Sequence, residues 1–377
     1  MTKRMLFVSH ASNLSGAPIL LLNLTRSLVK HSQVEIDFLI LQDGELVPEF
    51  EKIGKVHFPS KWRSRLNRIL KKVVPSLHVD AVSPRLLHRY DLILLNTIVS
   101  AKFFSKLKNA DMERTVLYIH ELPVEIASYL GDSEVSQILE QTGSVLVPSE
   151  AVRKGLEKFR LDDSNQSKIE SLHYFIPNQY SEREQSVNSE KGHRFVVGGC
   201  GQPSLRKGND LFLETARLLF ERYPDADIVF KWKGGLESSP FFRQLRRHID
   251  LIGLNGRVIF AENTREMAPF YAEIDVLFLS SREDPYPLVV LEAASAGRPT
   301  ICFENGGGAV EFVEDDAGTI VEFGRLESAV EAIMAYYRNP SLLEQHSLNA
   351  REKYLQRHAD GEAIARSFLN LCFGREK

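Results

Sequence analysis

The chain alternates short apolar runs with longer helix-like stretches, and it does so twice. In the first half the expected strands are Met5–Ser9, Glu35–Leu41, Leu92–Asn96, Thr115–Ile119 and Ser144–Val147. Such alternation is typical of a parallel sheet that is covered by helices on both faces. The first half therefore predicts a doubly wound α/β domain.

The second alternation begins after a polar, charged segment, Ser181–Gly192. Its expected strands are Phe195–Gly199, Asp227–Trp232, Val258–Phe260, Val276–Leu279, Thr300–Phe303 and Thr319–Val321, with helices such as Asp210–Tyr223 and Phe241–Leu251. A chain of 377 residues is too long for one ordinary core. We expect one domain over residues 1–180, a linker over 181–192, a second domain over 193–360, and a last helix in 361–377 that packs back on the first domain. Ligands of this fold class bind at the carboxyl ends of the strands, in a cleft between two such domains.

The composition excludes several classes of protein. Hydrophobic residues make up 43% of the chain, charged residues 26%, and the net charge is −3, as in an ordinary globular protein. No apolar run approaches the ~18 residues that span a bilayer, and MTKRMLFVSH leads straight into a strand, so we expect a cytoplasmic location. Cys200, Cys302 and Cys372 lie far apart and predict neither a disulfide framework nor a zinc site.

The segment Ile274–Ile301 places two carboxylates across a strand-to-helix junction. Asp284 lies in the loop after the strand Val276–Leu279, and Glu292 lies inside the apolar helix Leu288–Ala296. A carboxylate on such a helix either faces water at its edge or meets a polar ligand, since burying it without a partner costs several kcal/mol. A ligand rich in hydroxyl groups would satisfy Glu292.

Two glycine-containing loops could approach a phosphate group. Gly198–Gly201 follows the first strand of the second half and leads to Arg206 and Lys207. Gly307 and Gly308 follow the strand Thr300–Phe303. Either a diphosphate binds here, or the loops are turns with solvated basic residues.

In the first half, the loop after Met5–Ser9 enters the helix Ile19–Lys30 through Gly16 and Ala17. It lacks the G-x-G-x-x-G pattern, which argues against a nicotinamide dehydrogenase. Gly16 and Ala17 either face an anion at a helix N-terminus or form a tight turn. His120 follows the strand Thr115–Ile119, where it would point into the cleft.

A basic amphipathic stretch lies in Ser60–Val74. Its basic stripe comprises Lys61, Arg65, Arg68 and Lys72. Such a helix either lies on an anionic membrane surface or packs its apolar side on its own domain. Nucleic acid is disfavoured, because aromatic residues are few here and the whole chain is acidic.

The Ile274–Ile301 segment resembles the donor-site motif of retaining family 4 glycosyltransferases, S-x-x-E-G-F-G-L-V-x-L-E-A-x-A-x-G-x-P. The residues on this frame are Ser281, Asp284, Leu288, Val289, Leu291, Glu292, Ala293, Gly297 and Pro299. Pro285-Tyr286-Pro287 replaces Gly-Phe-Gly, and Glu283 lies one position out of register with the acidic residue. Gly201 and Lys207-Gly208 match the family's G-R-x-x-x-x-K-G with Gln202 in place of Arg, and Gly307, Gly308 and Glu311 match its Gly-Gly-x-x-Glu.

The resemblance implies a GT-B fold of two doubly wound Rossmann-like domains that face across a cleft. It implies retaining transfer, without metal or other cofactor, from a nucleoside-diphosphate sugar to a saccharide or lipid-linked saccharide, in cell-surface polysaccharide synthesis. The implied donor site comprises Gly16, Ala17, Gly201, Arg206, Lys207, Asp284, Leu288, Val289, Glu292, Gly307 and Gly308. Arg206 and Lys207 would neutralise the diphosphate, Glu292 would bind the ribose, Asp284 or Glu283 the sugar, and His120 would position the sugar.

Two other interpretations remain open at this point. A nucleotide-sugar 2-epimerase or a phosphorylase would use the same architecture. A non-catalytic subunit that binds a sugar nucleotide or a membrane would keep the fold for assembly.

Overall fold

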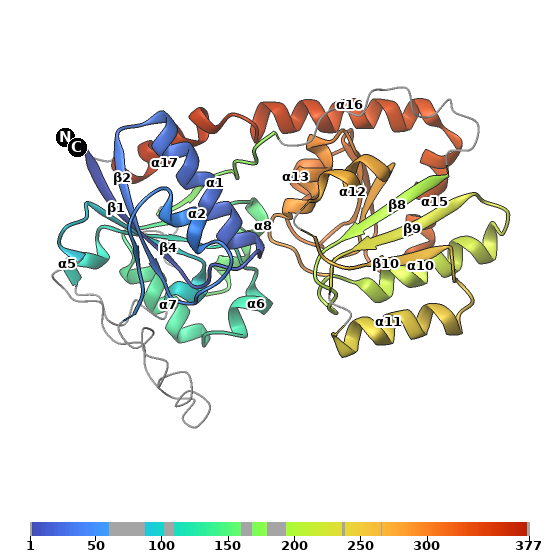
Figure 1. Cartoon of the computed structure of the whole chain (residues 1–377), viewed down its shortest axis with the longest axis horizontal. Coiled ribbons are helices and arrows are strands. Elements are labelled where there is room, and N and C mark those ends of the chain that lie inside the picture. Colours follow the sequence, from blue (N-terminus) through green and yellow to red (C-terminus); the bar gives the residue numbers. More distant parts are fainter. Residues whose placement is uncertain are drawn as a thin grey trace. The chain divides into compact units, whose positions relative to one another are not determined.

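The computed structural model describes residues 2–59, 87–101, 109–159, 168–178, 194–235, 238–264 and 266–374. These form two compact units (Figure 1): unit 1 combines 1–176 with 360–377, and unit 2 is 177–359. The predicted linker 181–192 and the basic residues Lys61, Arg65, Arg68 and Lys72 lie outside the described residues.

Unit 1 contains a seven-stranded parallel sheet in the order β3-β2-β1-β4-β5-β6-β7. Its strands are β1 (Lys3–Ser9), β2 (Val34–Ile40), β3 (Val56–His57), β4 (Leu92–Asn96), β5 (Thr115–Tyr118), β6 (Ser144–Val147) and β7 (Ile169–Ser171). Its helices are α1 (Gly16–His31), α2 (Val47–Glu51), α5 (Asn109–Met112), α6 (Pro123–Ala127), α7 (Asp132–Gln141), α8 (Glu150–Glu157) and α17 (Gly361–Phe373). Every residue of β4, β5 and β6 is buried, as expected for strands with helices on both faces.

The carboxyl-terminal helix α17 belongs to unit 1 although it follows unit 2 in sequence. It packs along α1, as Figure 1 shows, and the Ser27 hydroxyl donates a hydrogen bond to the carbonyl of Gly361. Phe368 on α17 meets Phe7 on β1 edge to face, with ring centroids 5.9 Å apart. The end of the chain therefore covers the start of the first sheet.

Unit 2 contains a six-stranded parallel sheet in the order β10-β9-β8-β11-β12-β13. Its strands are β8 (Phe195–Cys200), β9 (Ile228–Lys233), β10 (Val258–Ala261), β11 (Val276–Leu279), β12 (Thr300–Phe303) and β13 (Gly318–Val321). Its helices are α10 (Asn209–Arg222), α11 (Pro240–Leu251), α12 (Ala268–Glu273), α13 (Leu288–Ser295), α14 (Ala309–Val313), α15 (Leu326–Arg338) and α16 (Pro340–Arg357).

Aromatic side chains fill the core of unit 2 beneath the carboxyl end of β8. Phe212 on α10 lies edge to face with Phe230 and Trp232, at centroid separations of 5.3 and 5.1 Å. A Cβ atom on Gly199 would lie only 2.4 Å from the Trp232 ring. The missing side chain of Gly199 therefore leaves room for the Trp232 ring in the core beneath the loop that follows β8.

Each sheet reverses its strand order at one point, between β1 and β4 in unit 1 and between β8 and β11 in unit 2. Consecutive strands lie on opposite sides of that point, so the loops that leave their carboxyl ends diverge and open a crevice. Gly16 and Ala17 follow β1, Lys207 follows β8 and Asp284 follows β11, so these residues lie at the two switch points. His120 and the Gly307–Gly308 loop follow the adjacent strands β5 and β12.

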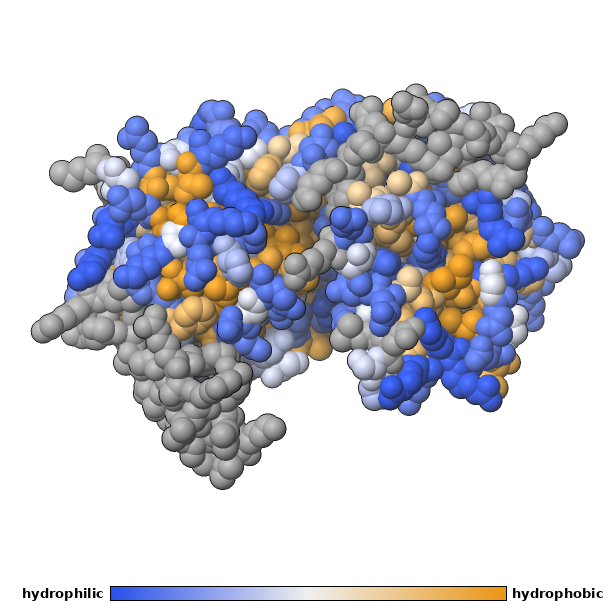
Figure 2. All heavy atoms as spheres, viewed as in Figure 1, coloured by the Kyte–Doolittle hydropathy of each residue, from blue (hydrophilic) through white to orange (hydrophobic). Residues whose placement is uncertain are grey.

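The apolar pattern predicted the long strands to within one or two residues at each end. It missed β3 and β7, which are edge strands of two and three residues with polar members. No helix in the described part of the chain is long and apolar enough to cross a membrane. On the face in Figure 2, hydrophilic residues interrupt the hydrophobic ones over both units.

Candidate active site

The loop between β8 and α10 forms one wall of the candidate site in unit 2. Gly208 ends it in the left-handed conformation, with a φ of 67°, and a Cβ atom there would lie 1.9 Å from the carbonyl oxygen of Ser280. Only glycine allows this close approach to the end of β11. Lys207 is thereby fixed against the neighbouring strand, where Ser280 donates a hydrogen bond to its carbonyl at 3.1 Å.

Lys207 and Asp284 form a buried ion pair at the switch point. The Lys207 Nζ atom lies 2.5 Å from Asp284 Oδ2, and the two side chains are 16% and 6% exposed. Opposite charges at this distance inside a protein interact far more strongly than in water. The structure therefore brings together the two predicted residues that lie 77 positions apart.

The loop between β11 and α13, which carries Asp284, forms a second wall of the site, and the glycine loop between β12 and α14 forms a third. The Asp284 N–H donates to Gly306 O at 2.8 Å, and the Gly308 N–H donates to Asp284 O at 3.0 Å. A Cβ atom on Gly307 would lie 1.8 Å from the Asp284 carbonyl oxygen. Gly307 and Gly308 thus support the loop that carries Asp284, whereas the sequence predicted either a contact with a diphosphate or a turn.

Two arginines link the β8–α10 loop to the β11–α13 loop. Arg206 Nη1 donates to the carbonyl oxygen of Glu283 at 2.9 Å, so Glu283 contributes its backbone to the site. Arg282 pairs with Asp210 through two bonds of 2.8 and 2.6 Å and donates to Leu205 O at 2.7 Å. The predicted diphosphate residue Arg206 therefore also holds the loop that carries Asp284.

Glu292 is half-buried on α13, and Tyr271 of α12 donates a hydrogen bond to its Oε2 atom at 2.7 Å. Burial raises the pKa of Glu292 to about 7, against the opposing effect of the Tyr271 hydroxyl. Burial, together with the charge of Glu292, raises the pKa of the nearby Cys200 thiol to about 12. Tyr271 is a site residue that the sequence analysis missed, because no motif marks it.

Pro285-Tyr286-Pro287 replaces the expected Gly-Phe-Gly with a rigid connection. Tyr286 is buried, and its hydroxyl lies 3.1 Å from Nε2 of His358, just beyond α16. Leu288 and Val289 then begin α13, where backbone N–H groups have no carbonyl partner within the helix. The loop is held by side-chain packing rather than by glycine turns.

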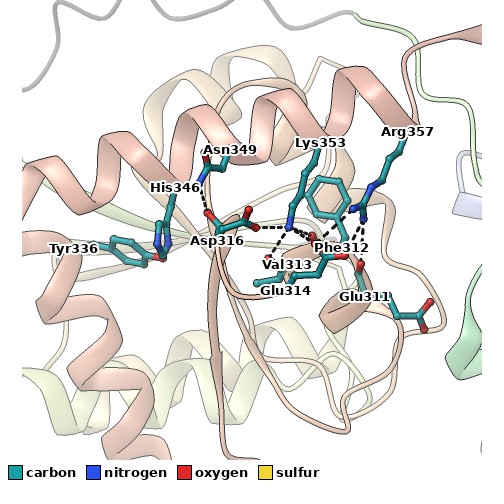
Figure 3. Close-up of polar contacts among 10 residues, drawn as sticks. All are labelled: Glu311, Phe312, Val313, Glu314, Asp316, Tyr336, His346, Asn349, Lys353 and Arg357. Atoms are coloured by element: carbon teal, nitrogen blue, oxygen red, sulfur yellow. Dashed lines mark hydrogen bonds and ion pairs between the residues drawn. The ribbon is translucent and has the colours of Figure 1, made fainter.

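Helix α16 also fixes the loop after α14, as Figure 3 shows. Lys353 forms ion pairs with Glu314, at 2.6 Å, and with Asp316, and it reaches the carbonyls of Phe312 and Val313. Glu314 has a φ of 47°, which is costly for a residue with a side chain. Lys353 thus stabilises the strained turn at Glu314, which follows the carboxyl end of α14, the helix that begins after the glycine loop.

We expect the substitution Lys353→Met to destabilise unit 2 by about 2 kcal/mol. Methionine keeps the aliphatic stem but leaves two carbonyls and Asp316 without their cation, while Glu314 keeps its ion pair with Arg357. Both carboxylates are half-exposed, so water recovers part of the loss. Urea denaturation measures the change. Arg366→Met, in an exposed pair on α17, is the control and should shift the unfolding free energy by less than about 0.5 kcal/mol. Equal shifts in both variants would contradict the role of Lys353.

In unit 1, His120 is buried and both of its ring nitrogens have partners. Nε2 lies 2.8 Å from Asn96 Oδ1, and Nδ1 lies 2.9 Å from the Tyr174 hydroxyl. Because the Asn96 amide nitrogen donates to Ala17 O at 3.0 Å, its oxygen must accept from His120 Nε2. Nδ1 therefore accepts from Tyr174. Burial lowers the pKa of His120 to about 3, so the ring is neutral.

The structure thus connects three predicted residues of unit 1, since Asn96 joins His120 to the Gly16–Ala17 start of α1. The sequence analysis did not single out Asn96 or Tyr174. One signal was available for Asn96, because it ends a predicted strand beside the strand that His120 follows. No pattern indicated Tyr174, whose contribution depends on the tertiary fold.

Residues 194–339 match the family model described as glycosyl transferases group 1. The lipopolysaccharide core biosynthesis mannosyltransferase LpcC of Rhizobium leguminosarum bv. viciae is 25% identical over 157 residues, which are 42% of this chain and 45% of that protein. The D-inositol 3-phosphate glycosyltransferase of Corynebacterium urealyticum is 30% identical over 131 residues, 34% of this chain and 31% of that protein. The chain thus spans less than half the length of either relative.

Among solved structures, Anabaena HepE in complex with UDP and glucose superposes with a TM-score of 0.77 at 17% identity, covering 97% of this chain and 98% of that one. Similarity at this level of identity shows the fold. It confirms the predicted GT-B architecture of two Rossmann-like α/β units.

Proposed function

We propose, from the match of residues 194–339 to the glycosyl transferases group 1 model, that this chain is a retaining glycosyltransferase. It moves a sugar from a nucleoside-diphosphate sugar to a saccharide or lipid-linked saccharide acceptor. The observation that carries the proposal is the buried Lys207–Asp284 pair at the switch point of unit 2. Relatives named for lipopolysaccharide core synthesis support a role in cell-surface polysaccharide synthesis.

In this proposal Lys207 neutralises the diphosphate, which is both the bound anion and the leaving group. Negative charge on that group grows as the glycosidic bond breaks, so Lys207 binds the transition state more strongly than the substrate. A cationic side chain at this position makes a divalent metal unnecessary. Turnover is accordingly expected to persist in EDTA.

In this proposal, Glu292 and Asp284 bind different parts of the donor. Glu292 accepts hydrogen bonds from ribose hydroxyls, and Asp284, whose carboxylate lies beside Lys207, accepts from hydroxyls of the transferred sugar. The carbonyl oxygen of Glu283 accepts a hydrogen bond from Arg206, and we place Glu283 second to Asp284 as the ligand of the sugar. Leu288 and Val289 offer backbone N–H groups at the start of α13 to the diphosphate.

His120 has a positioning role in this proposal, because a neutral ring with both nitrogens in use is not arranged to take a proton. It holds Asn96, which in turn holds the turn at Gly16 and Ala17.

Association with an anionic membrane surface through Lys61, Arg65, Arg68 and Lys72 is proposed from sequence alone. Flotation with anionic and neutral liposomes tests it, and equal flotation after these four residues are neutralised would remove it.

The test of the function is a thermal-shift screen with UDP-glucose, GDP-mannose and ADP-glucose. A ligand that binds only the folded state stabilises it by RT ln(1 + [L]/Kd), about 2.7 kcal/mol at 100 times Kd. One nucleotide class should raise the melting temperature, and the same donor should release its nucleoside diphosphate when acceptors are added. Binding without turnover would favour a non-catalytic subunit. Rapid isomerisation of the donor sugar without an acceptor would favour an epimerase.

A further inference from the structure

Glu292 uses its two carboxylate oxygens differently. It lies on α13, whose other residues are apolar or small, so the helix itself offers it no polar partner. The Oε2 atom accepts the hydrogen bond from the hydroxyl of Tyr271 at 2.7 Å. No described residue hydrogen-bonds the other oxygen, Oε1. Oε1 is therefore the oxygen that is left for a ligand.

The neighbouring titratable groups do not compete for this carboxylate. The Cys200 thiol, at the end of β8, is affected by the charge of Glu292 but stays neutral, because burial raises its pKa to about 12. Lys207 pairs with Asp284. Arg351 of α16 donates to the carbonyl oxygen of Ser295. Tyr271 is thus the partner that decides how Glu292 is held.

The Tyr271 side chain is fully buried, so its hydroxyl group has little freedom to turn away. An ionised carboxylate can only accept hydrogen bonds, and the hydroxyl must therefore donate its proton to Glu292. A donor to the ionised form favours that form, so the hydroxyl lowers the pKa of Glu292 against the effect of burial. Tyr271 thereby fixes the orientation of the carboxylate and favours its charge.

Arg298 fixes the backbone that carries Tyr271. The last carbonyl groups of a helix have no N–H partner within it. At the end of α12, the carbonyl oxygen of Tyr271 accepts from Arg298 Nε at 3.0 Å, and that of Ala272 accepts from Nη2 at 3.1 Å. One guanidinium group therefore holds two successive carbonyls of the helix that presents the hydroxyl.

The turn at the end of α13 brings Arg298 to this place. Gly297 has a left-handed φ of 67°, and its N–H donates to the carbonyl of Ala294 at 2.9 Å. The Arg298 N–H donates to the carbonyl of Ala293 at 2.8 Å. Such a glycine-based cap ends a helix and redirects the chain. The segment that carries Glu292 thus also carries the arginine that fixes its partner.

We propose that Tyr271 and Arg298 are positioning residues of the donor site in unit 2. The Tyr271 hydroxyl holds Oε2 of Glu292, which presents Oε1 to the hydroxyl groups of a ribose, and Arg298 holds Tyr271 in place. The ligand class is a ribonucleoside diphosphate. This inference rests on the proposed function and names two residues of the same site that no motif marks.

The hold on Glu292 is tested without any ligand by ¹³C carboxyl NMR titration of the full chain, with Glu292→Gln used for assignment. The wild-type midpoint is expected near the raised pKa of about 7. Tyr271→Phe removes only the hydroxyl, so the midpoint should rise by about one pH unit. Tyr336→Phe is the matched control, because it removes another buried hydroxyl of unit 2, bonded to His346 at 2.8 Å. An unchanged midpoint in Tyr271→Phe would overturn the proposal.

The role in binding is tested by calorimetry with UDP, GDP or ADP, whichever the thermal-shift screen selects, and with its 2′,3′-dideoxy counterpart. At pH 7 the Kd of Tyr271→Phe for the ribonucleotide should rise about fivefold, as the ionised fraction of Glu292 falls from about a half to about a tenth. The loss should be smaller at pH 9. The dideoxy ligand lacks the hydroxyls that Glu292 would bind, so its Kd should change less than about twofold. Equal losses for both ligands would reduce Tyr271 to a structural residue.

Arg298→Met should weaken binding of the ribonucleotide selectively in the same way, because the end of α12 is released. Arg298→Lys should recover part of the affinity, since an ammonium group can still donate to these carbonyls. An Arg298→Met protein that binds like the wild type would remove Arg298 from the proposal. If the wild type binds none of the three nucleoside diphosphates, the proposed function fails, and the ribose role of Tyr271 fails with it. If it binds one of them and Tyr271→Phe weakens both ligands equally, only the present inference fails.

Discussion

Replacing Lys207 by alanine is expected to lower kcat/KM for sugar transfer by about 1,000-fold, the effect of removing a preorganised group that stabilises transition-state charge. The loss has two sources. The diphosphate loses its counter-charge, and Asp284, only 6% exposed, is left as an unpaired carboxylate that repels the anionic donor. Steady-state kinetics, with the affinity for the donor's nucleoside diphosphate from calorimetry, separate the loss in binding from the loss in turnover.

The same substitution should destabilise unit 2 by about 3 kcal/mol, because one partner of a buried ion pair remains without the other. Adding Asp284→Asn to Lys207→Ala should recover part of this stability but none of the activity. Lys231→Ala is the matched control, since Lys231 pairs with the half-exposed Glu273 away from the loops of the site. Full activity in Lys207→Ala would exclude Lys207 as the diphosphate ligand.

Sequence reasoning succeeded where one local property decides the structure. Strands such as β4, β11 and β12 are buried throughout, so their apolar runs ended within a residue of the observed bounds. It failed at β3 and β7, where pairing with a neighbouring strand, rather than composition, makes the strand. Such short edge strands carry too little pattern to be recognised.

The same distinction separates the site residues. Lys207, Asp284 and Glu292 sit at fixed spacings within single loops or helices, and the motifs found them. Tyr174 and Tyr271 contribute through hydrogen bonds between distant segments, which depend on strand register and helix packing. His120 was placed correctly at the end of β5, yet only the structure shows that its nitrogens are occupied.

Glu292→Gln is expected to change stability in a pH-dependent way. Burial raises the folded-state pKa of Glu292 from its usual 4.5 to about 7. A carboxyl group with a raised pKa favours the folded state below its unfolded pKa, and this contribution is lost as pH rises through the folded pKa. The variant should therefore match the wild type near pH 4.5 and exceed its unfolding free energy at pH 8.5 by roughly 3 kcal/mol. Denaturation at both pH values measures this.

The variant should also bind the nucleoside diphosphate that the thermal-shift screen selects more weakly, although it is more stable at alkaline pH. A hydrogen bond from a ribose hydroxyl to a carboxylate is worth about 1.5–3 kcal/mol, so the Kd should rise about 10-fold to 100-fold at pH 8.5. Ribose donors favour the ionised form, so wild-type affinity should increase as pH rises through 7, and the variant should lose that part of the dependence. Burial also raises the pKa of Glu121 in unit 1 to about 7, but this group is the same in both proteins. The difference between their pH dependences therefore reports Glu292 alone. An unchanged Kd together with an unchanged stability profile would place Glu292 outside the donor site and return it to the edge of a helix facing water.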